Sequence, residues 1–78
     1  MERIELLSLT ETEAVYKYFP EHETEIHGIV SVNRQSGKRT IRQLADGYGS
    51  EYAFHAFNEI ERYIAVDNFR PTGMVAWY

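Results

Sequence analysis

The middle of the chain concentrates cations that could contact phosphate groups. These are Arg34, Lys38, Arg39 and Arg42, and no carboxylate interrupts the segment 34–42. Cations on a β-hairpin can reach a nucleic-acid backbone, and Tyr16 or Tyr18 would add stacking surface if they lay nearby. Two other interpretations stay open: the cations pair with the chain's own glutamates, or they contact an acidic protein partner.

The overall charge argues against general nucleic-acid binding. The net charge is −4, and residues 1–25 alone carry seven carboxylates against Arg3 and Lys17. A net-acidic chain is a poor candidate for binding nucleic acid through its whole surface. Nucleic-acid binding by the basic hairpin 34–42 therefore remains the alternative hypothesis, not the leading one.

Two other segments contain residue types that are used in binding sites. His22 and His27 flank three acidic or polar positions, but they are five residues apart and would face opposite sides of a strand. The chain has no cysteine and no helical His-Glu-x-x-His pattern, so we predict no metal site. The segment 47–50, Gly-Tyr-Gly-Ser, lacks the third glycine of a dinucleotide-binding turn and is expected to be a structural loop.

No pattern in the sequence indicates catalysis. The serines are not in a Gly-x-Ser-x-Gly turn, and a chain of 78 residues has little volume for a cleft that would hold a pair of carboxylates. We therefore predict a protein without enzymatic activity, catalytic residues or a cofactor.

Four strands, one helix and a final strand would position these residues. Alternating or β-branched and aromatic residues predict strands over 3–9, 14–19, 25–33 and 39–45, with a hairpin turn at 33–38. In the third strand Ile26, Gly28, Val30 and Val32 share one face, and Gly28 marks either a bulge or a close approach of the helix. The apolar run 73–78 predicts a final strand.

The helix has the clearest pattern in the chain. Small and apolar residues recur at three- and four-residue steps from 51 to 66. Ser50 is placed to cap the first turn with its side chain, and Glu51 favours the positive end of the helix dipole. Asn68 can adopt the left-handed conformation that ends a helix, and Pro71 prevents its continuation.

These elements predict one α+β domain over residues 1–78. The order is ββββαβ, and the expected architecture is a largely antiparallel, curled sheet of four to five strands with the amphipathic helix packed on one face. The start of the chain is charged and no window approaches the length of a bilayer span, so we expect a soluble, cytoplasmic protein that is not inserted in a membrane.

One helix is too narrow to cover all the apolar side chains of these strands. The second strand alternates Val15 and Phe19 with Tyr16 and Tyr18, so both of its faces carry apolar groups. Either the sheet curls around its own side chains, or its second face meets another copy or another protein. Tyrosine and tryptophan are enriched at interfaces, so we predict a protein-interaction module, a homodimer or a docking partner, with an interface at Tyr16, Tyr18, Trp77 and Tyr78.

Overall fold

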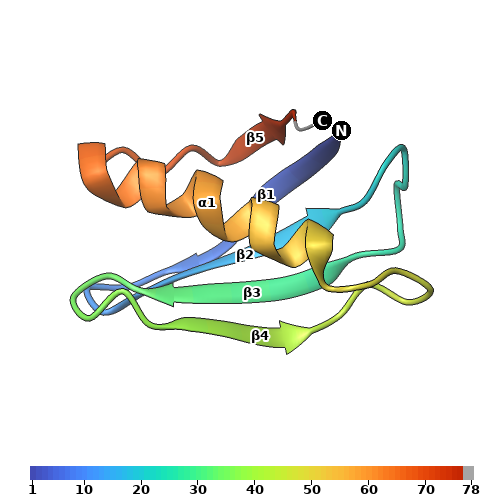
Figure 1. The fold of residues 1–78 in the computed structure, drawn as a ribbon. Helices are drawn as coiled ribbons and strands as arrows, with labels where there is room; N and C mark the ends of the chain where they lie inside the picture. Colours follow the sequence, from blue (N-terminus) through green and yellow to red (C-terminus); the bar gives the residue numbers. More distant parts are fainter. Residues whose placement is uncertain (77–78) are drawn as a thin grey trace.

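The computed structural model describes residues 1–76 and contains one five-stranded sheet and one helix (Figure 1). The elements are β1 (Glu2–Leu9), β2 (Glu13–Phe19), β3 (Gly28–Asn33), β4 (Arg39–Gln43), α1 (Glu51–Val66) and β5 (Thr72–Val75). The strands lie in the order β4-β3-β2-β1-β5, and every neighbouring pair is antiparallel. The predicted α+β fold and the element order ββββαβ are confirmed, and the sheet does not close into a barrel.

Short polar turns connect β1 to β2 and β3 to β4. The Thr10 hydroxyl accepts hydrogen bonds from the N–H groups of Thr12 and Glu13, which closes the first turn. In the second turn the Asn33 side-chain oxygen accepts from two backbone N–H groups, and Gly37 has a φ of 77°, in the region that favours glycine. The hairpin predicted at 33–38 is confirmed.

The register decides which side chains lie under the helix. Tyr16 stands opposite Val30, and Tyr18 stands opposite Gly28, so these four residues share the face that α1 covers. A Cβ atom at Gly28 would lie 2.1 Å from the Tyr18 ring. The glycine therefore makes room for an aromatic ring from the neighbouring strand. Gly28 pairs with Tyr18 without a register shift, so it does not mark a bulge in the β2–β3 ladder. Ile26 lies in the loop before β3.

The helix occupies the predicted residues, but its two ends differ from expectation. Ser50 is the N-cap residue, yet its side chain makes no capping hydrogen bond. Asp67 takes the left-handed conformation at the C-terminal end with a φ of 51°, the role predicted for Asn68. The N–H groups of Asp67 and Asn68 donate to the carbonyl oxygens of Ile64 and Tyr63, so the last turn is still closed.

The core lies between α1 and the sheet. The helix packs mainly over β3 and β2 and less over β5, and it contributes Ala53, Ala56, Phe57 and Ile60 to the buried cluster. The small residues Ala53 and Ala56 let the helix approach the sheet closely. Because α1 lies over the middle of the sheet, β4 remains at an uncovered edge (Figure 1). Within residues 1–76, α1 has neither the length nor the apolar character to cross a lipid bilayer.

Candidate interaction surfaces

The two tyrosines predicted to form an interface are core residues. Tyr16 and Tyr18 have no exposed surface, because the register turns both rings toward α1. The Tyr16 hydroxyl donates to the Arg70 carbonyl oxygen at 2.8 Å, and the Tyr18 hydroxyl accepts from the Ala45 N–H at 3.1 Å. Burial raises the pKa of both hydroxyls. The prediction that these two residues contact a partner is therefore corrected, while Trp77 and Tyr78 lie outside the described residues.

The face of the sheet turned away from α1, here called the far face, carries apolar residues beneath charged ones. Phe19 is buried on this face although no helix covers it. The Arg3 guanidinium lies 4.1 Å from the centre of the Phe19 ring, and the His27 ring lies 5.4 Å away. Arg3 is itself paired with Glu5. A long cationic side chain thus shields the ring from water in place of a second layer.

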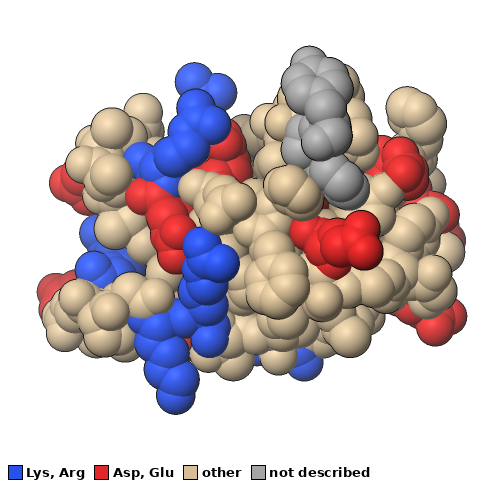
Figure 2. All heavy atoms as spheres, viewed as in Figure 1, with Lys and Arg blue, Asp and Glu red and all other residues tan. Residues whose placement is uncertain are grey.

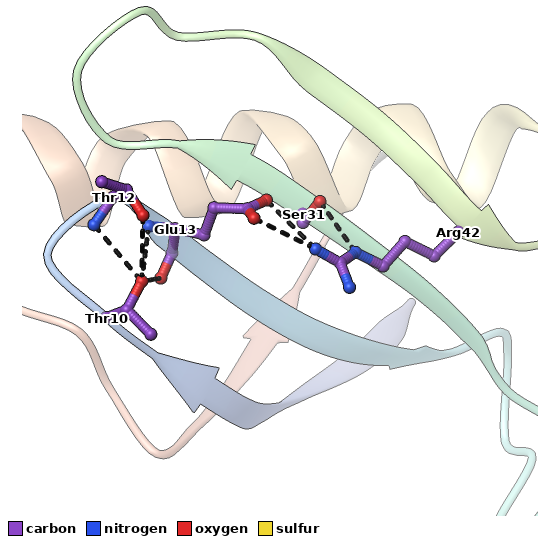
Figure 3. Close-up of polar contacts among 5 residues, drawn as sticks. All are labelled: Thr10, Thr12, Glu13, Ser31 and Arg42. Carbon is purple, nitrogen blue, oxygen red and sulfur yellow. Dashed lines mark hydrogen bonds and ion pairs between the residues drawn. The ribbon is translucent and has the colours of Figure 1, made fainter.

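Arg42 covers the far face in a similar way near the other end of β2. Its guanidinium donates to both carboxylate oxygens of Glu13 at 3.1 and 3.2 Å and to the Ser31 hydroxyl at 3.2 Å. Figure 3 shows the arginine reaching from β4 across β3 to Glu13 on β2, with the helix behind the sheet. Val15, which stands opposite Ser31, is buried in the same region. The apolar residues of the far face are therefore largely covered by the chain's own polar side chains.

The basic hairpin is mostly neutralised by neighbouring acids. Arg39 donates two 2.8 Å hydrogen bonds to Glu61 and a third to Asn58, which raises the pKa of Arg39 and lowers that of Glu61. Arg34 donates to the Thr10 carbonyl oxygen at 2.6 Å and lies 3.5 Å from Asp67. Arg42 pairs with Glu13 as described above, whereas Lys38 forms no ion pair within residues 1–76. The structure thus pairs three of the four predicted cations with carboxylates.

Charge is nevertheless distributed unevenly over the molecule. In Figure 2 the Lys and Arg side chains gather on the left half, over the β3–β4 turn and the last part of α1. Asp and Glu predominate at the opposite end, where the segments 21–25 and 46–51 carry five carboxylates and no Lys or Arg. The molecule is therefore dipolar along its length, with much of the positive end compensated locally.

Four exposed apolar side chains surround the free edge of β4. Ile41, Leu44 and Phe54 are 37%, 48% and 48% exposed, and Ile26 lines the same shallow depression as Leu44. We call Ile26, Ile41, Leu44 and Phe54 the β4 patch. Figure 1 shows α1 running antiparallel to β4. Arg39 pairs with Asn58 and Glu61, so Ile41, two residues further along β4, comes level with Phe54, one turn back along α1.

The exposure of the β4 patch follows from the position of the helix. Ile41 stands opposite Val30 on the helix-facing side, and Val30 is fully buried while Ile41 is not, because α1 packs mainly over β3 and β2 and contacts β4 through the long side chain of Arg39. Sequence reasoning missed this surface. It assigned no inward side to the fourth strand and gave no role to Phe54, although Phe54 lies off the apolar stripe of the helix and could have been recognised as an exposed aromatic residue.

The histidine-containing segment does not form a cluster of metal ligands. His22 borders a depression lined also by Arg3, Glu21, Glu23, Thr24 and Met74, whereas His27 packs against Phe19. Among residues 1–76, no group of three or more acidic, histidine or cysteine side chains is placed to hold a metal ion. Glu21 and Glu23 instead accept hydrogen bonds from the hydroxyls of Tyr52 and Tyr48. The Glu21 contact raises the pKa of Tyr52 to about 12.

Comparison with known proteins adds no assignment to these surfaces. No family model, curated protein or solved structure matches the chain.

Proposed function

We propose that this protein is a non-enzymatic interaction module that self-associates through the β4 patch. The observation that carries the proposal is the gathering of Ile41, Leu44 and Phe54, each more than a third exposed, beside an unpaired strand edge. Exposed apolar groups that cluster rather than scatter are typical of surfaces that become buried in a complex. An open strand edge adds backbone hydrogen-bonding groups to the same surface.

The β4 patch replaces the surface first expected from the sequence. The far face has weaker support as an interface, because Arg3 and Arg42 already lie over its apolar residues. Opening that face to a partner would break the ion pairs with Glu5 and Glu13. No such rearrangement is needed at Phe54 or Leu44.

Light scattering across a concentration series tests the proposal. We expect the average mass to rise from that of one chain toward that of two. Phe54→Asp should shift this transition to much higher concentration, because it places a charge in the apolar surface. Met74→Asp is the matched control, since Met74 is 58% exposed on the far face, away from the β4 patch. A strictly monomeric protein, or an equal effect of the two substitutions, would refute the proposal.

Nucleic-acid binding by the hairpin 34–42 has less support. Its three arginines are engaged with Asp67, Glu61 and Glu13, so contact with phosphate would have to compete with existing ion pairs. This alternative predicts that DNA or RNA is retarded at low salt and that Arg39→Glu combined with Arg42→Glu abolishes the retardation. Absence of retardation at low salt would exclude it.

A further inference from the structure

The free edge of β4 exposes a short, regular set of backbone hydrogen-bonding groups. The Asn33 N–H donates to the Lys38 carbonyl oxygen at 2.9 Å, so Lys38 directs its C=O group toward β3. Hydrogen-bonded and non-hydrogen-bonded pairs alternate along an antiparallel ladder. Thr40, opposite Ser31, therefore also bonds toward β3. It follows that Arg39 and Ile41 direct their N–H and C=O groups outward, where no strand formed by residues 1–76 lies.

The regular part of this edge ends at a turn on its N-terminal side and at a bulge on its C-terminal side. The β3–β4 turn ends at Lys38, and the register shifts between Ile29 and Val30, where β4 has one extra residue at Arg42. A bulge disrupts the ladder locally and bends the strand that contains it. The stretch from Arg39 to Ile41 is thus the part of β4 on which another strand can continue the sheet.

We propose that two copies of the chain pair their β4 strands edge to edge in antiparallel orientation, with Thr40 on the two-fold axis. This inference rests on the proposed self-association and specifies its partner and geometry. In that register Arg39 of each copy stands opposite Ile41 of the partner subunit. The outward N–H and C=O groups of these residues then bond reciprocally, so the two five-stranded sheets become one.

A second copy fits this edge because one patch supplies both halves of a two-fold interface. Arg39 and Ile41, on either side of Thr40, both direct their N–H and C=O groups outward. A two-fold axis at Thr40 therefore brings the outward groups of one copy opposite those of the other. Ile41 lies on the helix-facing side of β4 and Phe54 lies on α1, so a strand from a second copy would cover exposed surface of Ile41 beside the helix. Arg39 enters the contact with its charge compensated by Glu61.

The charges near the axis allow this register. Lys38 comes opposite Arg42 of the partner subunit, which brings two cations together. Glu13 offsets this repulsion, because its carboxylate forms an ion pair with Arg42 and neutralises the charge of the guanidinium (Figure 3). A pairing that moved the axis beyond Ile41 would have to cross the bulge at Arg42.

Single-cysteine cross-linking tests the geometry, since the natural chain contains no cysteine. Two residues on a two-fold axis in a non-hydrogen-bonded pair have Cα atoms about 4.5 Å apart, within the range that a disulfide spans. Thr40→Cys should therefore form a disulfide-linked dimer under mild oxidation. Thr72→Cys is the matched control, because Thr72 is also an exposed threonine on an edge strand. We expect several-fold more cross-linked product from the Thr40 variant.

Amide hydrogen exchange provides a second test on the unmodified protein. The N–H group of Thr40 already faces β3 and that of Lys38 donates to the Ser36 hydroxyl, so their exchange should depend little on protein concentration. The N–H groups of Arg39 and Ile41 should exchange several-fold more slowly at concentrations where light scattering detects the dimer. This measurement uses the natural sequence and so does not depend on whether a variant folds.

The results separate the geometry from the function on which it rests. Three results would overturn edge pairing but leave self-association standing, provided that the protein is a dimer. They are equal cross-linking of the Thr40 and Thr72 variants, cross-linking through Ile41→Cys in place of Thr40→Cys, and Arg39 and Ile41 amides that are not protected from exchange. A monomer at every concentration overturns both.

Discussion

Phe57 and Phe19 are buried to nearly the same extent by two different kinds of cover. Phe57 is 1% exposed in the layer between α1 and the sheet, where most of the cover is other apolar side chains and the Arg39 guanidinium lies 5.2 Å from the ring centre, farther than Arg3 lies from Phe19. Phe19 is 5% exposed on the far face, where the cover is the Arg3 guanidinium and the His27 ring. A strand with apolar residues on both faces therefore does not require a second layer or a partner, because long polar side chains can shield the second face.

The largest expected difference between the two sites is the loss of free energy of unfolding when each phenylalanine ring is removed. Phe57→Ala should lower the free energy of unfolding by about 3–5 kcal/mol, the range for deleting a phenylalanine from a packed core. Phe19→Ala should cost less, about 2 kcal/mol, because the flexible side chains over it can collapse into the space. Urea unfolding followed by circular dichroism measures both.

The control for this pair keeps the comparison valid if Phe57→Ala does not fold. Phe57→Leu retains most of the volume and should lose about 1 kcal/mol. Equal losses for Phe57→Ala and Phe19→Ala would show that the far face is as rigidly packed as the core, and would contradict the distinction between the two covers.

A second difference concerns tolerance of added volume beneath the helix. Gly28→Ala should lower the free energy of unfolding by about 2 kcal/mol, because its Cβ would overlap the buried ring of Tyr18. Gly49→Ala is the control, since nothing lies within 4 Å of a Cβ at that position, and its effect should stay within about 0.5 kcal/mol. Thermal or urea unfolding of the pair measures the difference. An equally mild effect at Gly28 would mean that Tyr18 can move aside.

Removing the polar cover of the far face should have a smaller effect on stability. Arg3→Gln should cost about 0.5–1 kcal/mol, the value of a cation over an aromatic ring at a partly exposed site. It should also increase binding of a hydrophobic dye, because the Phe19 ring is uncovered. Arg62→Gln is a suitable control, as Arg62 is highly exposed and pairs with Glu59 one helical turn away. Unchanged dye binding by Arg3→Gln would show that Arg3 does not shield the ring.

The smallest expected effect lies at the rim of the helix-covered face, where Arg39 holds Glu61. The hydrogen bonds from Arg39 lower the Glu61 pKa below its ordinary value of 4.5. The stabilisation is therefore fully present above pH 4.5 and is lost as the pH falls through the lower, folded-state pKa. It should amount to about 0.5 kcal/mol, since the pair is partly exposed to solvent. Carboxyl NMR titration of the native protein and of Arg39→Gln measures the pKa, which should return toward 4.5 in the variant.

Much of the fold was predictable because local patterns determine it. The turn at Asn33, the glycine at 37 and the apolar steps from 51 to 66 act through hydrogen bonds and steric limits within a few residues. Two predictions of local features were wrong. The Ser50 side chain does not cap the helix, and the residue in the left-handed conformation is Asp67 in place of Asn68. These errors are confined to helix ends, where alternative closures differ little in energy.

The candidate surface was far less predictable. Tyr16 and Tyr18 were expected at an interface because aromatic residues are common there, and the register placed them in the core. Phe54 drew no attention within the helix pattern, although it is among the exposed apolar residues of the molecule. Residue type alone could not separate a buried aromatic from an exposed one.

By itself, the sequence determined where strands, turns and the helix form and in what order they follow. Spacing of apolar residues and turn chemistry act over short distances, so they can be read along the chain. Only the tertiary structure decided which face of β2 lies under α1, that Arg3 and Arg42 cover the other face, and that α1 packs mainly over β3 and leaves Ile41 on β4 partly exposed. These outcomes depend on contacts between segments far apart in the chain, and a shift of one residue in strand register would have exchanged the two faces.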